Sequence, residues 1–395
     1  MTATKVQNGD KPAHAVNTSS PWLQPPPQPA TGLGEYRLLA PKAAVWVSPL
    51  QLGGMAFGDT WTHIAGKTTK EDVFKLLDAY VEAGGNFLDT ANVYQNEQSE
   101  TWIGEWLQLR GTRNRMVIST KYSAPYTKDR DEPGARISYL GNGKRSLHLS
   151  VRDSLQRLKC DWIDILYVHW WDYSTSIEEV VDSVHALVQS GKVLYLGVSN
   201  TPAWIVSAAN TYARDHGKTQ FSVYQGQWNL MARDMEREIL PMCRQFGMAV
   251  VPYDAMAGGR VRSKKQLDNG DHQATGKEMS EHERKVSEAL CEVAKEHNIE
   301  SPTAIALAWL LHKQPYVFPL IGTRNIHHML DNAQALQVKL TADQMQYIES
   351  FAAFEPGYPA GAFGPDPHID GSAAIMTKSA AHTKWVKFAG AIGNA

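Results

Sequence analysis

The sequence predicts an α/β protein built as one (β/α)8 barrel, the TIM-barrel architecture, with an extension at each end. Short apolar runs alternate with amphipathic helical patterns along most of the 395 residues. The runs have the character of strands buried on both faces, which is typical of a parallel sheet. Eight strand-then-helix repeats in about 300 residues favour a closed barrel over a doubly wound sheet.

The eight strands are expected at the apolar runs between the two extensions. These are Val47–Leu52, Asn86–Leu88, Met116–Ser119, Ile163–Val168, Val193–Val198, Phe221–Tyr224, Ala249–Pro252 and Val317–Ile321. Amphipathic patterns follow most of them and predict helices. The clearest are Thr69–Ala83, Arg145–Leu158, Ser176–Gln189, Pro202–His216 and Met235–Phe246. Several end at a glycine, as expected for a left-handed residue after a helix.

A Rossmann domain is the competing architecture. It requires a G-x-G-x-x-G turn after its first strand, followed directly by a helix. The segment Leu52–Gly58 lacks that spacing, and no helical pattern follows it directly. Any nucleotide would therefore be held in a different way.

The ends of the chain differ from its centre in composition. Residues 1–44 are polar and proline-rich, which predicts an extended arm and not a folded unit. Residues 45–354 contain the barrel. Residues 355–395 begin with a segment rich in glycine and proline, so we expect a tail that is disordered or drapes over the mouth of a pocket. The polar stretch Lys264–Lys277 is expected to be mobile.

Composition and charge restrict the classes of function. The net charge is −2 with acids and bases interspersed, which gives no attraction to nucleic acid or anionic lipid. No stretch reaches the roughly eighteen apolar residues of a membrane helix, and the N-terminus lacks the apolar run of a signal peptide. Three widely spaced cysteines indicate a reducing compartment. We expect a cytoplasmic protein that acts on a small molecule, and its oligomeric state stays open.

Polar residues gather after the predicted strands, where barrel enzymes place their chemistry. Asp89 and Tyr94 follow the second strand, Lys121 follows the third and His169 follows the fourth. Taken singly, each has a structural explanation, such as a helix cap or a solvated charge. Together they would meet at one rim of the barrel. A purely structural role for each residue does not explain why four such residues gather there.

The chemistry of these four residues is that of an acid–base site without a metal. Lys121 at the end of an apolar strand needs a partner to stay charged, and Asp89 on the next strand can supply it. A cation beside a phenol lowers the phenol pKa from about 10, so we expect Lys121 to tune Tyr94 as a proton donor. His169 would orient a carbonyl or join the proton relay.

Five segments between residues 45 and 350 resemble motifs of the aldo-keto reductase family. They are Gly85–Tyr94, Ser119–Lys121, Leu166–His169, Gly197–Asn200 and Ile321–Arg324, the last followed by Asn332. Any one of these motifs is weak, whereas five in order rarely match by chance. The arm, the tail and the run His169–Asp172 are most similar to the fungal aryl-alcohol dehydrogenase and norsolorinic-acid-reductase-like branch.

The resemblance implies an NADPH-dependent oxidoreductase that reduces an aldehyde or ketone to an alcohol, in secondary metabolism or in detoxification of aromatic aldehydes. Hydride would come from the nicotinamide and the proton from Tyr94, whose pKa is lowered by Lys121 paired with Asp89. Ser199, Asn200 and Gln225 would hydrogen-bond the nicotinamide carboxamide, and Tyr253 would stack on the nicotinamide ring. At the adenosine end, Arg324 would bind the 2′-phosphate with Thr323 beside it, and Asn332 would lie at the adenine. The expected NADP(H) contacts are Gly54, Met55, Asp89, Ser199, Asn200, Gln225, Tyr253, Asp254, Ala255, Met256, Gly258, Arg260, Gly322, Thr323, Arg324, His328, Asp331 and Asn332.

Aromatic residues in the loops after the strands predict a pocket for an aromatic or flat polycyclic carbonyl. Besides Tyr94 and His169, the expected substrate residues are Phe57, Trp61, Trp170 and Trp171. Packing at the barrel rim is the structural explanation for the same four side chains.

Two other functions stay open. A nicotinamide-binding regulatory subunit that senses redox state would keep the four polar residues with little turnover, and the proline-rich arm would be its partner segment. A barrel hydrolase or isomerase without nicotinamide would need a carboxylate pair or a metal cluster at the rim, and the sequence shows neither.

Overall fold

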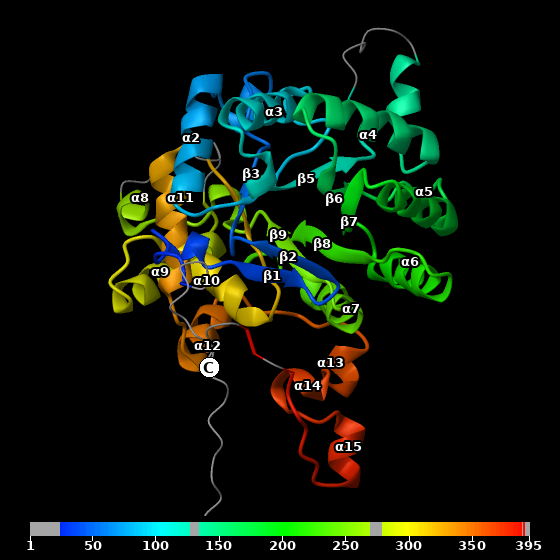
Figure 1. Cartoon of the computed structure of the whole chain (residues 1–395). Helices are drawn as coiled ribbons and strands as arrows, with labels where there is room; N and C mark the ends of the chain where they lie inside the picture. Colours follow the sequence, from blue (N-terminus) through cyan, green and yellow to red (C-terminus); the bar gives the residue numbers. More distant parts are fainter. Residues whose placement is uncertain (1–23, 127–133, 269–278, 389, 392–395) are drawn as a thin grey trace, which may run out of the picture.

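Eight parallel strands form a single sheet in the computed structural model, which describes residues 24–126, 134–268, 279–388 and 390–391. The strand order is β10-β3-β4-β5-β6-β7-β8-β9. A parallel bridge between Val250 and Val317 joins the two edges. The sheet is thus a nearly closed barrel surrounded by helices (Figure 1), and the predicted fold class is confirmed.

Each barrel strand overlaps one of the eight predicted strands. They are β3 (Gln51–Gly53), β4 (Phe87–Asp89), β5 (Val117–Tyr122), β6 (Ile163–Val168), β7 (Val193–Ser199), β8 (Phe221–Gln227), β9 (Ala249–Tyr253) and β10 (Leu320–Gly322). Two of them, β5 and β8, continue three residues beyond the apolar run. The polar side chains of Lys121 and Gln225 form hydrogen bonds inside the barrel, so the strand pairing continues past the last apolar residue.

Most of the helices cover the outside of the barrel, and they include all five that the patterns predicted. They are α1 (Thr62–Ala65), α2 (Lys70–Glu82), α3 (Gln98–Arg110), α4 (Lys144–Leu158), α5 (Ile177–Gln189), α6 (Ala203–Asp215), α7 (Ile239–Phe246), α8 (Lys264–Asp268), α9 (Glu281–Glu296), α10 (Pro302–Lys313), α11 (Ile326–Ala333), α12 (Ala342–Ser350), α13 (Ala360–Phe363), α14 (Pro367–Asp370) and α15 (Ile375–Ala380). Thr69 and Ser176 cap α2 and α5 by accepting a hydrogen bond from the backbone three residues on. Residues 269–277 of the stretch expected to be mobile lie outside the described residues.

An antiparallel hairpin, β1 (Arg37–Ala40) and β2 (Ala43–Val47), precedes the barrel. Leu39 and Val47 are fully buried in one cluster with Phe87 and other side chains from inside the barrel. The hairpin therefore closes the N-terminal end of the barrel.

The predicted arm of residues 1–44 needs a correction. Residues 37–44 are folded, because their apolar side chains fill the end of the barrel and gain a burial that an isolated hairpin could not reach. Residues 1–23 lie outside the described residues.

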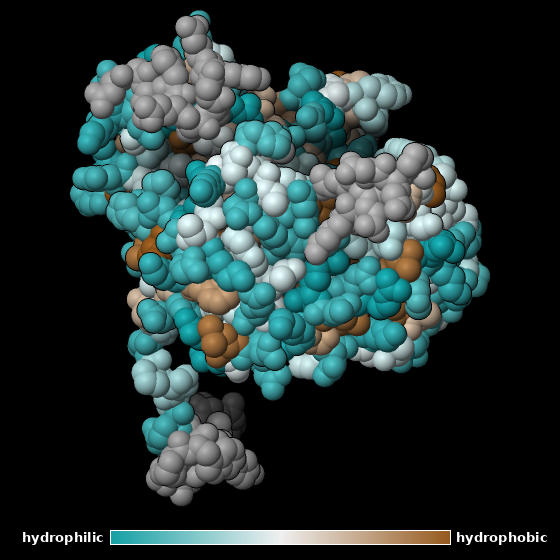
Figure 2. Space-filling model, turned by 90° about the horizontal axis from the view of Figure 1, so that it is seen from above, coloured by the Kyte–Doolittle hydropathy of each residue, from teal (hydrophilic) through white to brown (hydrophobic). Residues whose placement is uncertain are grey.

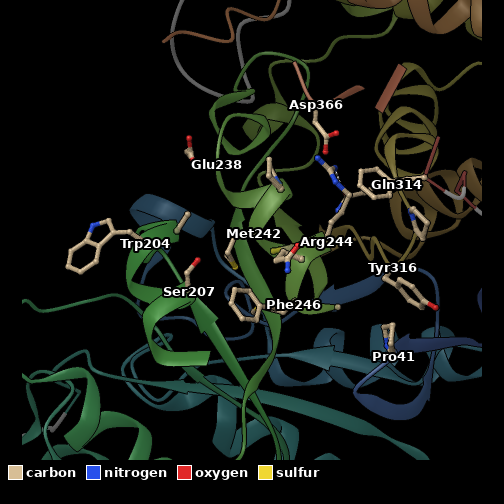
Figure 3. A pocket seen from close by; sticks show the side chains of 18 residues that line it. Pro41, Trp204, Ser207, Glu238, Met242, Arg244, Phe246, Gln314, Tyr316 and Asp366 are labelled. Atoms are coloured by element: carbon tan, nitrogen blue, oxygen red, sulfur yellow. Dashed lines mark hydrogen bonds between the residues drawn. The ribbon is translucent and has the colours of Figure 1, made fainter. Parts of the chain in front are cut away.

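The C-terminal segment leaves the barrel near α7, and in Figure 1 its helices α13, α14 and α15 lie below α7, with α15 farthest from the strands. Asp366 and Phe388 line a groove of about 870 Å³ with residues of α6 and α7 (Figure 3). In this groove Arg244 Nη1 donates to Gln314 Oε1 at 2.7 Å. Met248, which directly precedes β9, also lines it, so this part of the tail packs near the N-terminal end of the strands. Of the two alternatives for the tail, disorder or a position over the mouth of a pocket at the C-terminal ends of the strands, the second does not hold for Asp366 and Phe388.

The helices of the described ranges include no candidate membrane span. None of the helices described there is both long enough and apolar enough to cross a bilayer. The face drawn in Figure 2 is mostly hydrophilic, with hydrophobic side chains in small separate groups.

Gly104 allows α3 and α4 to pack closely. A Cβ at this position would overlap Arg157 O and lie 2.7 Å from the carbonyl carbon of Leu158. Since both atoms belong to the backbone, the helices would have to separate. We expect Gly104→Ala to lower the free energy of unfolding by about 1–3 kcal/mol, despite the better helix propensity of alanine. Urea denaturation followed by circular dichroism measures the change.

Gly361→Ala in α13 is the matched control, since its Cβ would make ordinary contacts at 3.8 Å. It should change the free energy of unfolding far less. A Gly104→Ala protein as stable as the wild type would show that α3 and α4 are not in close backbone contact.

Candidate active site

Lys121 lies at the centre of the site, near the C-terminal end of β5, and is 1% exposed. Its Nζ donates to Asp89 Oδ2 at 2.5 Å and to Thr90 O at 2.8 Å. Burial opposes the charge, but the nearby Asp89 and Tyr94 outweigh burial and hold the Lys121 pKa above its ordinary value. Lys121 and Asp89 therefore form a charged pair inside the barrel.

The second oxygen of Asp89 is also bound. Asp89 Oδ1 accepts hydrogen bonds from Ser119 Oγ at 2.8 Å and from Gln225 Nε2 at 3.1 Å. Gln51 Nε2 in turn donates to Ser119 Oγ at 3.0 Å. Side chains of β3, β4, β5 and β8 thus form one buried polar network that holds the carboxylate from several sides.

Tyr94 lies in the loop after β4, with Lys121 Nζ 4.8 Å from its ring centroid. Burial raises the Tyr94 pKa, Lys121 lowers it and Asp89 raises it, and the net value lies above the ordinary 10.0. Lys121 lowers the Tyr94 pKa, as expected. The expected net lowering is wrong, because burial raises the Tyr94 pKa more than Lys121 lowers it. Near neutral pH the phenol keeps its proton, which is the form that a proton donor needs.

His169 follows β6 and faces Tyr94, with ring centroids 6.0 Å apart and an interplanar angle of 80°. Burial, and then Lys121, lowers the His169 pKa to about 3. The imidazole is therefore neutral near pH 7. Its buried Nδ1 has no hydrogen-bond partner among the residues that the structure describes.

A second group of predicted residues lies next to His169. Asn200 Nδ2 donates to His169 O at 3.1 Å and to Ser199 Oγ at 3.0 Å. Tyr253 OH donates to Asn200 Oδ1 at 3.0 Å. Three residues expected at the nicotinamide, Ser199, Asn200 and Tyr253, are therefore in contact. Gln225, expected there too, contacts Asp89 instead, and its backbone oxygen accepts from Asn200 N at 3.4 Å.

The segment after β10 carries the residues expected at the adenosine end. Arg324 is exposed, and its Nη1 donates to Lys67 O at the long distance of 3.4 Å. A Cβ on Gly322 would meet no atom within 4 Å, so there is open space beside this strand end. Asn332 is 4% exposed, and its Oδ1 accepts from Thr303 Oγ1 at 3.1 Å.

The remaining expected cofactor residues lie at the same ends of the strands. Gly54 N donates to Asp89 O at 2.7 Å, and Met55 beside it is 45% exposed. After β9, Asp254 Oδ2 accepts from Gln227 Nε2 at 2.9 Å. Gly258 has a φ of 61°, the left-handed region that favours glycine. Of the others, Ala255, Met256 and Arg260 lie in the loop after β9, Thr323 directly follows β10, and His328 and Asp331 belong to α11.

The four aromatic residues expected at the substrate separate into two pairs. Trp61 lies edge-on to Tyr94 with ring centroids 6.2 Å apart, and Trp170 is 37% exposed. Phe57 and Trp171 are 0% and 6% exposed and belong to the hydrophobic core. The prediction of substrate contact is therefore wrong for Phe57 and Trp171, which are core residues.

Several polar residues that support the site were not predicted from the sequence. Ser119 and Gln51 complete the network around Asp89, and Gln95 and Asn96 bind the loop that carries Trp61. Ser119 stands two residues before Lys121 and faces the same side of the strand, so period-2 spacing could have identified it. No sequence signal marks the other three, because their partners lie far away in the chain.

The chain matches a model of the aldo/keto reductase family over residues 49–353. It is 53% identical over 377 residues to the aldo-keto reductase ausK of Emericella nidulans, covering 94% of this chain and 95% of that protein. It is 48% identical over 374 residues to an aryl-alcohol dehydrogenase (NADP(+)) of Phanerodontia chrysosporium, covering 91% and 96%. Identity to the norsolorinic acid reductase stcV of Emericella nidulans is 47% over 335 residues, covering 85% and 86%.

The neutral His169 makes stability depend on pH. Below about pH 6.5 the unfolded chain takes up a proton at this ring, whereas the folded-state pKa of about 3 keeps it neutral. The unfolded state then binds more protons, so the free energy of unfolding falls as the pH falls. Between about pH 7 and pH 4.5 we expect the free energy of unfolding to fall more in the wild type than in His169→Gln. The difference should be about 1–2 kcal/mol, after allowance for partial exposure of the ring.

Urea denaturation at both pH values measures the difference between the two proteins. His282→Gln, at the exposed start of α9, is the control and should follow the wild type. An equal fall in the wild type and in His169→Gln would show that the folded imidazole titrates normally.

Proposed function

Because the chain belongs to the aldo/keto reductase family, we propose that it is an NADPH-dependent carbonyl reductase in which Tyr94 protonates the carbonyl oxygen. Family membership confirms the resemblance of its motifs and makes the chain an oxidoreductase that uses a nicotinamide cofactor and acts on small molecules. The observation that carries the proposed role of Tyr94 is the buried Lys121–Asp89 pair beside its ring.

The proposed chemistry divides among four side chains. Tyr94 holds the proton on its phenol oxygen, because its raised pKa keeps the phenol neutral until a stronger base forms beside it. Lys121 stabilises the phenolate that is left after transfer, and Asp89 keeps Lys121 charged. His169, as a neutral imidazole, donates a hydrogen bond that orients the carbonyl oxygen. The bound nicotinamide supplies the hydride.

The residues present fit such a cofactor. The amide side chain of Asn200 can satisfy both the donor and the acceptor of a carboxamide, and it lies beside the backbone of His169, with Ser199 and Tyr253 as its neighbours. Arg324 at the open space beside Gly322 suits the 2′-phosphate that distinguishes NADP from NAD. The relative from Phanerodontia chrysosporium that is named for NADP(+) supports this preference.

We further propose an aromatic or polyketide-like carbonyl as the substrate. Two of the relatives are named for an aryl alcohol and for norsolorinic acid. Trp61 and Trp170 supply aromatic surface near Tyr94 and His169. The enzyme names of these relatives also weigh against a purely regulatory subunit.

The proposed catalytic domain is residues 45–354, which the match over residues 49–353 supports. A cytoplasmic location is also proposed. All three cysteines are free, and two of them are buried, as suits a protein that needs no oxidising compartment.

Replacement of the Tyr94 hydroxyl tests the proton donor. We expect Tyr94→Phe to lower kcat for an aromatic aldehyde by about 100-fold or more, because general acid catalysis commonly contributes about 10²–10⁴-fold. NADPH consumption at saturating aldehyde measures turnover. Tyr36→Phe, ahead of the N-terminal hairpin and 46% exposed, is the control and should keep full activity. Unchanged turnover in Tyr94→Phe would exclude it as the acid.

Removal of the Arg324 guanidinium tests the cofactor preference. Arg324→Ala should weaken NADPH binding by about 10–100-fold, because charge-assisted hydrogen bonds to phosphate contribute about 1.5–3 kcal/mol. NADH lacks the 2′-phosphate, so its affinity should change little. Fluorescence titration of both cofactors provides the measurement, with the exposed Arg152→Ala on α4 as control. Equal weakening of NADPH and NADH would refute the assignment of Arg324 to the phosphate.

A further inference from the structure

The backbone directly after Tyr94 is left-handed for three residues in succession. Gln95, Asn96 and Glu97 have φ angles of 52°, 50° and 78°, and none of them is glycine. Residues with a side chain rarely adopt this region, and they stay there where surrounding contacts fix them. The turn therefore indicates that something specific holds the chain beside the proposed acid.

Gln95 makes those contacts, and its side chain has no exposed surface. Its Oε1 accepts hydrogen bonds from Trp61 N at 2.8 Å, Thr60 N at 3.1 Å and Thr60 Oγ1 at 3.3 Å. Its Nε2 donates to Met55 O at 2.9 Å. All of these partners belong to residues 55–61, the loop between β3 and α1. One amide group thus binds both ends of that loop.

The loop passes directly over Gln95. A Cβ on Gly58 would overlap Gln95 Cβ and lie 2.5 Å from Gln95 Cγ, so glycine is needed for this approach. The neighbouring Asn96 Oδ1 accepts from Trp61 Nε1 at 3.0 Å. Trp61 is therefore fixed twice, at its backbone through Gln95 and at its indole through Asn96. Its ring lies edge-on to Tyr94 as a result.

We propose that Gln95 is a positioning residue that fixes Trp61 against Tyr94 and so determines recognition of aromatic carbonyls. The inference rests on the proposed function, since it names what Trp61 does there. A ring that is already held in place loses little freedom when a flat substrate packs on it, so affinity for such a substrate depends on the hydrogen bonds of Gln95. Glutamine suits the position because one planar group accepts from two N–H groups and donates to a carbonyl.

Gln95→Met tests the proposal, because methionine keeps the length of the side chain and removes every one of these hydrogen bonds. We expect KM for an aromatic aldehyde to rise about tenfold, while kcat changes by less than about threefold. The pH dependence of kcat should stay the same, since Tyr94, Lys121 and Asp89 are unaltered. KM for a small aliphatic aldehyde should change little. Gln108→Met, on the exposed face of α3, is the matched control.

A double-mutant cycle with Trp61→Ala decides whether Gln95 acts through Trp61. If it does, adding Gln95→Met to Trp61→Ala should raise KM by less than about twofold, since coupled residues are not additive. The same tenfold rise in both backgrounds would overturn the proposal. Gln95→Glu is a second variant in case Gln95→Met folds poorly. It keeps the acceptor for the Thr60 and Trp61 N–H groups, so its KM should lie between those of the wild type and Gln95→Met.

Amide hydrogen exchange gives a readout that does not depend on turnover. In Gln95→Met the amides of Thr60 and Trp61 should exchange about tenfold faster, while the barrel strands exchange as in the wild type. Unchanged exchange at these two amides would overturn the positioning role. A wild-type protein that consumes no NADPH with any aldehyde would refute the proposed function instead, so the two failures are distinguishable.

Discussion

The buried ion pair between Lys121 and Asp89 is the constraint on which the rest of the site depends. Two charges removed from water are costly unless their remaining hydrogen-bonding capacity is satisfied. The barrel meets this condition with Ser119 and Gln225 on Asp89 and with Thr90 O on Lys121. Because these groups come from β5, from β8 and from the residue after β4, the pair can exist where the closed sheet brings those strands together. Burial at the same place, together with the charge of Lys121, sets the protonation of the nearby Tyr94 and His169.

The two ends of the barrel have different roles, with packing at the N-terminal end and the proposed chemistry at the C-terminal end. At the N-terminal end, the hairpin and the inward apolar side chains form a closed cluster. At the C-terminal end, the inward side chains are polar and contact one another. The loops at this end depend on side-chain contacts for their shape, as the hydrogen bonds of Gln95 to residues 55–61 show. In barrels of this kind, substrate preference changes when the loops change while the strands stay the same. A rigid scaffold whose loops are held by side-chain contacts suits this division.

Tertiary packing explains where the sequence-based expectations were wrong. Phe57 and Trp171 follow strand ends as Trp61 and Trp170 do, so position in the chain cannot separate core aromatics from rim aromatics. The hairpin before the barrel is mostly apolar along both strands, but it gains its burial from the cluster that it closes, which the local sequence does not reveal. The net direction of the Tyr94 pKa depended on burial, and burial is a property of the assembled site.

The sequence by itself determined the number and order of the barrel strands, the five helices that it predicted and the four polar residues at the strand ends. Strand and helix patterns are local, and in a parallel barrel the ends of neighbouring strands meet whatever the loops do. The tertiary structure alone decided which oxygen of Asp89 binds Lys121, that Gln225 contacts Asp89, and that Gln95 holds Trp61 against Tyr94. These contacts join residues far apart in the chain, and no local pattern encodes them.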